Sequence, residues 1–168
     1  NPAAKTNLDV TNVAGLTDVV LKGGDGSLVT VAAGTVVTFD GATAAAQRVD
    51  TTATATAATV GLTNGATVTA LTVNGAAVKT LNIASNGSAA NTITALDGTA
   101  TAQAGSTLNV TGTQKLTVTG ALATTFTTVN ASTNTGGVSV AFGVNDVTVT
   151  GGAGNDTFNF GANLTVAD

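Results

Sequence analysis

The chain of 168 residues contains no cysteine, histidine, methionine, tryptophan or tyrosine, and its nine acidic residues are all aspartate. Without histidine and cysteine, the sequence lacks the usual general base and the thiolate nucleophile. None of its serine and lysine residues stands in a recognisable catalytic motif. The same absences remove the ligands that zinc, copper and iron prefer. We therefore expect that this chain is not an enzyme.

Charge is also scarce, because charged residues make up 8% of the chain and the formal net charge is −4. A weakly acidic chain is a poor partner for nucleic acid, whose phosphates attract a basic surface. The sequence has no run of about 18 apolar residues, so it predicts no transmembrane helix. The lack of cysteine is typical of a protein that meets oxidants outside the cell without using disulfides.

Three residue types dominate what is present: 36 threonines, 31 alanines and 21 glycines form more than half of the chain. Threonine and valine favour pleated, half-buried surfaces, so we expect an all-β fold. The alanine-rich residues 42–58 show no apolar stripe of helical period and are expected to form a loop or weak strands. We expect a β-rich N-terminal subregion over residues 1–60 and a second region over residues 61–168.

Short segments with alternating aliphatic and polar residues recur at steps of 8 to 11 residues. This alternation predicts strands with one buried face. Asn-Gly and Asp-Gly dipeptides fill many of the intervals and predict turns. The residues expected to point into the core are Leu71, Val73, Leu81, Ile83, Leu108, Val110, Leu116, Val118, Val147, Val149, Phe158 and Phe160.

Two architectures contain regularly spaced short strands. An antiparallel β-sandwich would use the Asn-Gly and Asp-Gly dipeptides as hairpin turns, whereas a parallel β-helix would use them as corners. The sequence Thr-Leu-Asn-Ile at residues 80–83 recurs as Thr-Leu-Asn-Val at residues 107–110, which is a plausible length for one turn of a helix of strands. Aromatic residues make up only 3% of the chain. We therefore expect a parallel β-helix (β-solenoid), with the sandwich as the alternative.

Residues 151–159 match every fixed position of GGxGxDxUx, a calcium-binding repeat of parallel β-helices. Glycines permit unusual backbone conformations and bring carbonyl oxygens close together. Asp156 adds a carboxylate, and Ca²⁺ prefers shells of about six to eight oxygen ligands. A partial copy at residues 143–149 places Asp146 ten residues before Asp156. The alternative is a glycine-rich corner in which Asp156 forms hydrogen bonds with its own backbone.

Residues 107–161 resemble the repeat region of RTX-type S-layer proteins and related large surface adhesins of Gram-negative bacteria. The shared segments are Leu-Asn-Val-Thr-Gly at residues 108–112, Leu-Thr-Val-Thr-Gly at 116–120, a bridge rich in alanine and threonine at 121–130, a valine-rich segment at 138–149, and Gly-Gly-Ala-Gly-Asn-Asp-Thr at 151–157.

This resemblance implies type I secretion without an N-terminal signal, calcium-dependent folding outside the cell and assembly into a surface lattice or fibre. It also implies that backbone carbonyls near Gly151 and Ala153 and the carboxylate of Asp156 bind calcium, with Asp146 as a further candidate. The chain departs from the family in having one intact nonapeptide.

We therefore expect a structural, self-assembling segment of a bacterial cell-surface (S-layer) protein that is stabilised by calcium. Its partners would be further copies of itself and, through other regions, a cell-surface polysaccharide. The alternatives are a spacer or ligand-binding module of a large RTX adhesin and the RTX appendage of a secreted enzyme. Because the chain starts without methionine and stops next to a strand-like segment, we expect it to be a fragment of a longer protein.

Overall fold

The computed structural model describes residues 7–23, 26–97, 105–143 and 146–161, which contain strands and no helix. The thirteen strands are joined by hydrogen bonds into one continuous arrangement. They are β1 (Asn7–Asp9), β2 (Asp18–Lys22), β3 (Leu28–Val31), β4 (Val36–Thr51), β5 (Ala57–Asn74), β6 (Thr80–Asn86), β7 (Asn91–Asp97), β8 (Ser106–Gly112), β9 (Leu116–Leu122), β10 (Phe126–Asn134), β11 (Val138–Phe142), β12 (Thr148–Thr150) and β13 (Thr157–Asn159).

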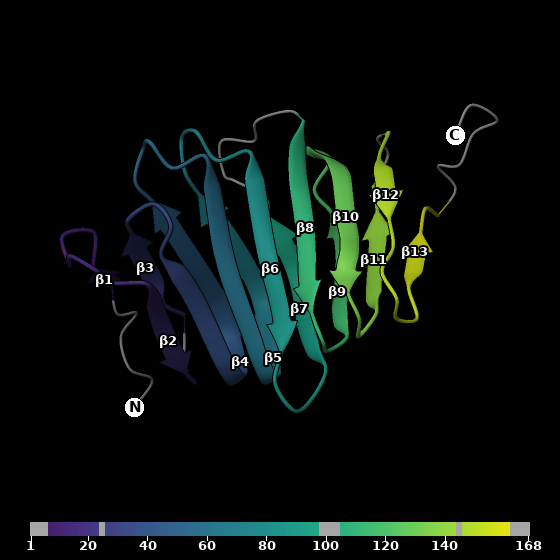
Figure 1. Ribbon diagram of the computed structural model, residues 1–168, viewed down its shortest axis with the longest axis horizontal. Coiled ribbons are helices and arrows are strands. Elements are labelled where there is room, and N and C mark those ends of the chain that lie inside the picture. Colours follow the sequence, from purple (N-terminus) through teal and green to yellow (C-terminus); the bar gives the residue numbers. More distant parts are fainter. Residues whose placement is uncertain (1–6, 24–25, 98–104, 144–145, 162–168) are drawn as a thin grey trace.

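The strands wind as a parallel β-solenoid of about six turns, along the long axis in Figure 1. Each strand pairs in parallel with strands of the neighbouring turns, for example β6 with β8 and β7 with β9. The predicted parallel β-helix is confirmed, and the sandwich alternative is wrong. The repeat noticed in the sequence is one turn, because Thr80 and Thr107 are register partners.

The solenoid has two faces joined by sharp corners. One face contains β6, β8, β10 and β12, and the other contains β7, β9, β11 and β13 (Figure 1). The long strands β4 and β5 turn from one face to the other at Gly41, with φ of 82°, and at Asn64 and Gly65, with φ of 58° and 75°. A positive φ suits glycine and asparagine, which explains why these residues occupy corners.

The core is a continuous stack of aliphatic side chains between the two faces. Eight of the predicted inward residues, from Leu71 to Val118 in the chain, are at most 2% exposed, which confirms them. The other four, Val147, Val149, Phe158 and Phe160, are partly buried and pack against this core. The rings of Phe142 and Phe160 stack with their centroids 4.8 Å apart. Strict alternation therefore predicted which side chains point inward.

The alanine-rich segment forms part of the solenoid. β4 continues through it to Thr51 and pairs with β5 as far as Asp50 and Asn74. The strand interpretation is therefore confirmed for residues 42–51, where pairing with a neighbouring turn compensates for weak local propensity. The predicted boundary at residue 60 lies within β5, and residues 57–63 of that strand pair with β6.

Candidate functional site

The nonapeptide forms the corner between β12 and β13. Asp156 directly precedes β13, and both oxygens of its carboxylate accept backbone hydrogen bonds at 2.8 Å. Oδ1 accepts from the Val138 N–H at the start of β11, on the preceding turn. Oδ2 accepts from the Gly152 N–H within its own corner. The carboxylate therefore ties the corner together and fastens it to the turn below.

The glycines of the motif are required by close packing of backbone against backbone. A Cβ atom at Gly152 would overlap the carbonyl oxygen of Asn134, and one at Gly154 would overlap the amide nitrogen of Gly137. Neither glycine has a positive φ. The unusual conformation expected from the sequence is therefore not the reason for glycine at these two positions. Their role is to let two successive corners approach closely.

Asn91 occupies the same position as Asp156 in an earlier turn. Register pairs Asn91 with Leu116 and Leu116 with Val138, and Asp156 stands beside Val138 on the next turn. The Oδ1 atom of Asn91 accepts a 2.8 Å hydrogen bond from the backbone N–H of Ala66 on the preceding turn. A side-chain oxygen that fastens consecutive turns is thus a recurring device, and Asp156 provides it within the calcium-type motif.

The sequence analysis missed the role of Asn91. Its signal was the spacing to the corner glycine, because Asn91 stands four residues after Gly87 as Asp156 stands four residues after Gly152. Asn134 is a second buried amide of this kind, whose Oδ1 accepts the Gly137 N–H at 2.7 Å. Such a role depends on contacts between turns that the sequence pattern does not display.

The other candidate ligands lie at different distances from Asp156. Gly151 adjoins the Asp156 carboxylate, since a Cβ added there would lie 2.5 Å from Oδ2. Ala153 donates its N–H to the carbonyl of Asn134 at 3.1 Å. Asp146 is exposed and precedes β12, whereas Asp156 follows it, so the strand separates them by about 10 Å.

This arrangement can supply part of a calcium shell. Within the described ranges, no three acidic, histidine or cysteine residues gather into a metal-binding group. Asp156 offers one carboxylate, whose two oxygens have further lone pairs beyond the two N–H bonds they accept. With the carbonyls of Gly151 and Ala153 this provides fewer than the roughly six to eight oxygens that Ca²⁺ requires. A further turn or water would have to provide the remainder.

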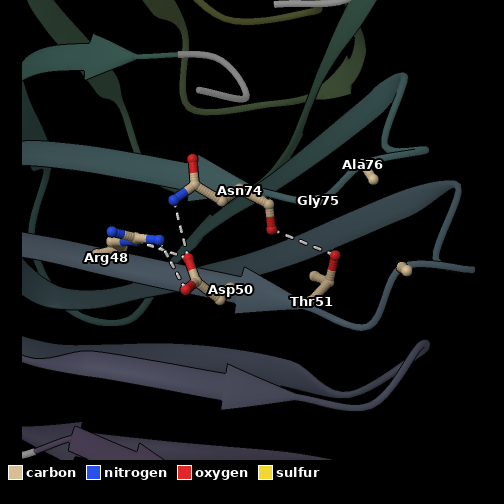
Figure 2. A pocket seen from close by; sticks show the side chains of 7 residues that line it. Arg48, Asp50, Thr51, Asn74, Gly75 and Ala76 are labelled. Atoms are coloured by element: carbon tan, nitrogen blue, oxygen red, sulfur yellow. Dashed lines mark hydrogen bonds and ion pairs between the residues drawn. The ribbon is translucent and has the colours of Figure 1, made fainter. Parts of the chain in front are cut away.

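A second polar feature lies on the outer surface of β4 and β5 (Figure 2). Arg48 makes a bidentate ion pair with Asp50, at 2.7 and 2.9 Å. Asn74 Nδ2 donates to Asp50 Oδ1 at 2.9 Å, and the hydrogen bond to Asp50 raises the pKa of Arg48. These groups border an open hollow of about 400 Å³ lined by Arg48, Asp50, Thr51, Ala53, Asn74, Gly75 and Ala76.

The sequence analysis did not single out this cluster. Arg48 and Asp50 are two residues apart on one strand and therefore share its outer face. Asn74 joins them only because β4 and β5 pair in register. The hollow offers guanidinium and amide donors above a small apolar surface, which suits a polar ligand.

A third cluster links successive corners near the N-terminal end. Lys22 Nζ lies 3.3 Å from Asp40 Oδ2, and Asn64 Nδ2 donates to Asp40 Oδ1 at 2.6 Å. Asn64 Oδ1 in turn accepts the Ser88 N–H at 3.2 Å. The hydrogen bond from Asn64, helped by Lys22, lowers the pKa of Asp40 and keeps its carboxylate charged. These contacts connect four consecutive turns and have a structural role.

Comparison with known proteins gives no relative, because no family model, curated protein or solved structure matches the chain. Among the residues that the structure describes, no helix has the length and apolar character needed to cross a membrane. Function must therefore be inferred from the chain's own residues and their geometry.

Proposed function

We propose that this chain is a segment of a structural, self-assembling bacterial cell-surface protein of the S-layer type, secreted and stabilised by calcium. One observation carries the proposal: the GGxGxDxUx sequence is a corner of a parallel β-solenoid, the architecture to which this calcium-binding repeat belongs. The resemblance of residues 107–161 to RTX-type S-layer proteins supports the same function.

The solenoid itself suits a scaffold. Each turn contacts only its neighbours, so the stack can be extended turn by turn without a new core. Its inward column is aliphatic, and its outer faces carry mainly threonine, asparagine and serine, which interact with water but contribute little charge. Such a body is stable and elongated, as a lattice or fibre requires.

In this proposal, calcium binds at the corner of residues 151–156. The Asp156 carboxylate and the carbonyls of Gly151 and Ala153 would hold the ion, and a neighbouring turn would complete the shell. Ca²⁺ that binds the folded state alone adds stability in proportion to RT ln(1 + [L]/Kd). The chain would then stay unfolded where calcium is scarce and fold after secretion.

The first test is thermal unfolding in millimolar calcium and in excess EGTA. We expect the melting temperature of the native chain to fall by about 5–10 °C in EGTA, since saturation near 100 times Kd adds about 2.7 kcal/mol. Asp156→Asn should melt at a lower temperature than the native chain in calcium and should lose its response to EGTA. Circular dichroism provides the measurement.

Asp97→Asn is the matched control, because Asp97 is an exposed aspartate on β7 and the substitution should preserve the response to EGTA. The substitution at Asp156 also removes an acceptor for the Gly152 or Val138 N–H, so lower stability alone does not identify a ligand. If EGTA leaves the native chain unchanged while Asp156→Asn melts early in both buffers, Asp156 is only a backbone fastener.

The second test concerns assembly. Electron microscopy of the full-length protein should show sheets or fibres in millimolar calcium and dispersed particles after chelation, because the lattice is built from calcium-stabilised solenoids. Sedimentation of the same samples measures the assembled fraction. Dispersed monomers under both conditions would reject the lattice.

The hollow beside Arg48 favours a second candidate, a ligand-binding module of a large surface adhesin. Its exposed guanidinium and the amide of Asn74 could meet the hydroxyl groups of a cell-surface polysaccharide. In that case the solenoid would act as a spacer and the protein would not form a lattice. Electron microscopy also separates these two functions.

A further inference from the structure

Four successive strands on one face of the solenoid present the same outward pair of polar residues. β6, β8, β10 and β12 are neighbours on this face (Figure 1). Each presents a threonine followed two residues later by asparagine or threonine, and the register aligns these positions from turn to turn. We name this set the threonine–asparagine array; it consists of Thr80, Asn82, Thr107, Asn109, Thr128, Asn130, Thr148 and Thr150.

The core holds the array in place. Leu81, Leu108 and Val129, which stand between the paired array residues, are at most 1% exposed. Threonine is restricted at χ1, and Asn109 Nδ2 donates to Asn82 Oδ1 at 2.9 Å. The array residues therefore have fixed positions, spaced by about 4.7–4.9 Å between strands and by about 6.6–6.8 Å along each strand.

The chemistry of the array narrows the choice of ligand. It contains no charged and no aromatic side chain, although both kinds occur elsewhere in the chain. An ionic ligand would be expected to meet charged partners, and a sugar ring lacks an aromatic platform here. Small molecules bind in concave sites, whereas the array lies on the outer face of a sheet. The fitting ligand is uncharged and repeats in two dimensions.

We propose that the threonine–asparagine array binds the ordered water of an ice crystal surface. Its hydroxyl and amide groups both donate and accept hydrogen bonds, as lattice water does. Its spacings in both directions are close to repeat distances of hexagonal ice. Water on a rigid array is ordered before it meets the crystal, so little entropy is lost on contact. This inference depends neither on calcium nor on self-assembly.

The opposite face is a poorer match. It also carries outward threonines, but the Thr119 hydroxyl donates to the carbonyl of Thr94 at 3.2 Å. The register on this face shifts between Val140 and Ala141, which interrupts the repeat along the strands. A lattice that must fit several turns at once would therefore bind the array instead. The two faces provide matched positions on the same turn, Thr107 on β8 and Thr117 on β9.

The test measures how much of the purified chain enters slowly grown ice and how strongly it slows ice recrystallisation under the microscope. We expect the native chain to be enriched in the ice fraction. Thr107→Lys, which places a long charged side chain in the centre of the array, should reduce enrichment several-fold. Thr107→Val, which keeps the shape and removes the hydroxyl, should give an intermediate loss. Thr117→Lys should behave like the native chain.

Circular dichroism and melting temperatures establish that each variant is folded, and Thr107→Val decides the matter if the lysine variant unfolds. Exclusion of the native chain from ice to the same extent as serum albumin would overturn the proposal. Equal losses in the two lysine variants, or retention of the native chain on insoluble cellulose or chitin but not in ice, would also overturn it.

Discussion

Replacing Asn91 with leucine is expected to lower the free energy of unfolding by about 3 kcal/mol. Asn91 is fully buried, and its Nδ2 donates to the carbonyls of Leu62 and Asn86 at 3.2 and 3.1 Å. Its Oδ1 accepts the Ala66 N–H at 2.8 Å. Leucine fits the space, because Leu116 occupies this position on the next turn, but it leaves these backbone groups unsatisfied.

The measurement is thermal unfolding, in which the leucine variant should melt about 6–12 °C below the native chain. Asn130→Leu is the control, because Asn130 is exposed on the outer face of β10 and the change there should cost no more than about 0.5 kcal/mol. Equal melting temperatures for the Asn91 variant and the native chain would show that apolar packing alone holds this corner.

Replacing Gly112 with alanine is expected to destabilise the solenoid by about 3 kcal/mol or more. Gly112 has a φ of 108°, which L-residues rarely adopt, and an added Cβ would overlap the carbonyl oxygen of Ser85 on the preceding turn. The obstacle is backbone rather than a flexible side chain, so the corner cannot yield without separating β8 from β6. Chemical denaturation measures the loss.

Gly34→Ala separates the two causes, because Gly34 has a φ of 86° and no heavy atom within 4 Å of an added Cβ. This control should lose only the conformational preference, about 1 kcal/mol. If the two alanine variants are equally stable, the close approach at Gly112 does not contribute. A larger loss at Gly112 would establish that successive corners touch through their backbones.

These predictions share a physical origin in the contact between consecutive turns. Parallel pairing fixes the register of the strands, but the corners must also be fastened and must stack closely. Asn91, Asn134 and Asp156 fasten corners through side-chain oxygens, and Gly112 and Gly152 allow them to stack. A change at any of these positions acts on two turns at once.

The corner of residues 151–156 combines both devices. This combination explains why the same sequence can be required for structure whether or not calcium binds. Asp156 accepts two N–H groups, and an asparagine side chain has only one oxygen with which to replace it. The comparison of melting in calcium and EGTA therefore distinguishes the ligand role from the fastening role, which sequence conservation of the carboxylate would not do.

The sequence by itself determined the strands and the direction of their side chains. Aliphatic and polar residues alternate with period two, and burial follows that period, as Leu81, Ile83, Leu108 and Val110 show. The recurrence of Thr-Leu-Asn after 27 residues also gave the length of one turn, because identical residues stack at the same position of successive turns. These features are local or periodic and are therefore readable along the chain.

Only the tertiary structure decided what lies across the turns. It separated Asp146 from Asp156 by placing them at opposite ends of β12, and it brought Asn74 to the Arg48–Asp50 pair. It also showed that Gly152 and Gly154 are needed for close approach and that the outward threonines and asparagines form an array. Turns of 18 to 27 residues, such as those from Asp18 to Val36 and from Thr80 to Thr107, vary in length. Because of this variation, a spacing in the sequence does not specify which residues meet; the hydrogen-bonded register of the folded solenoid does.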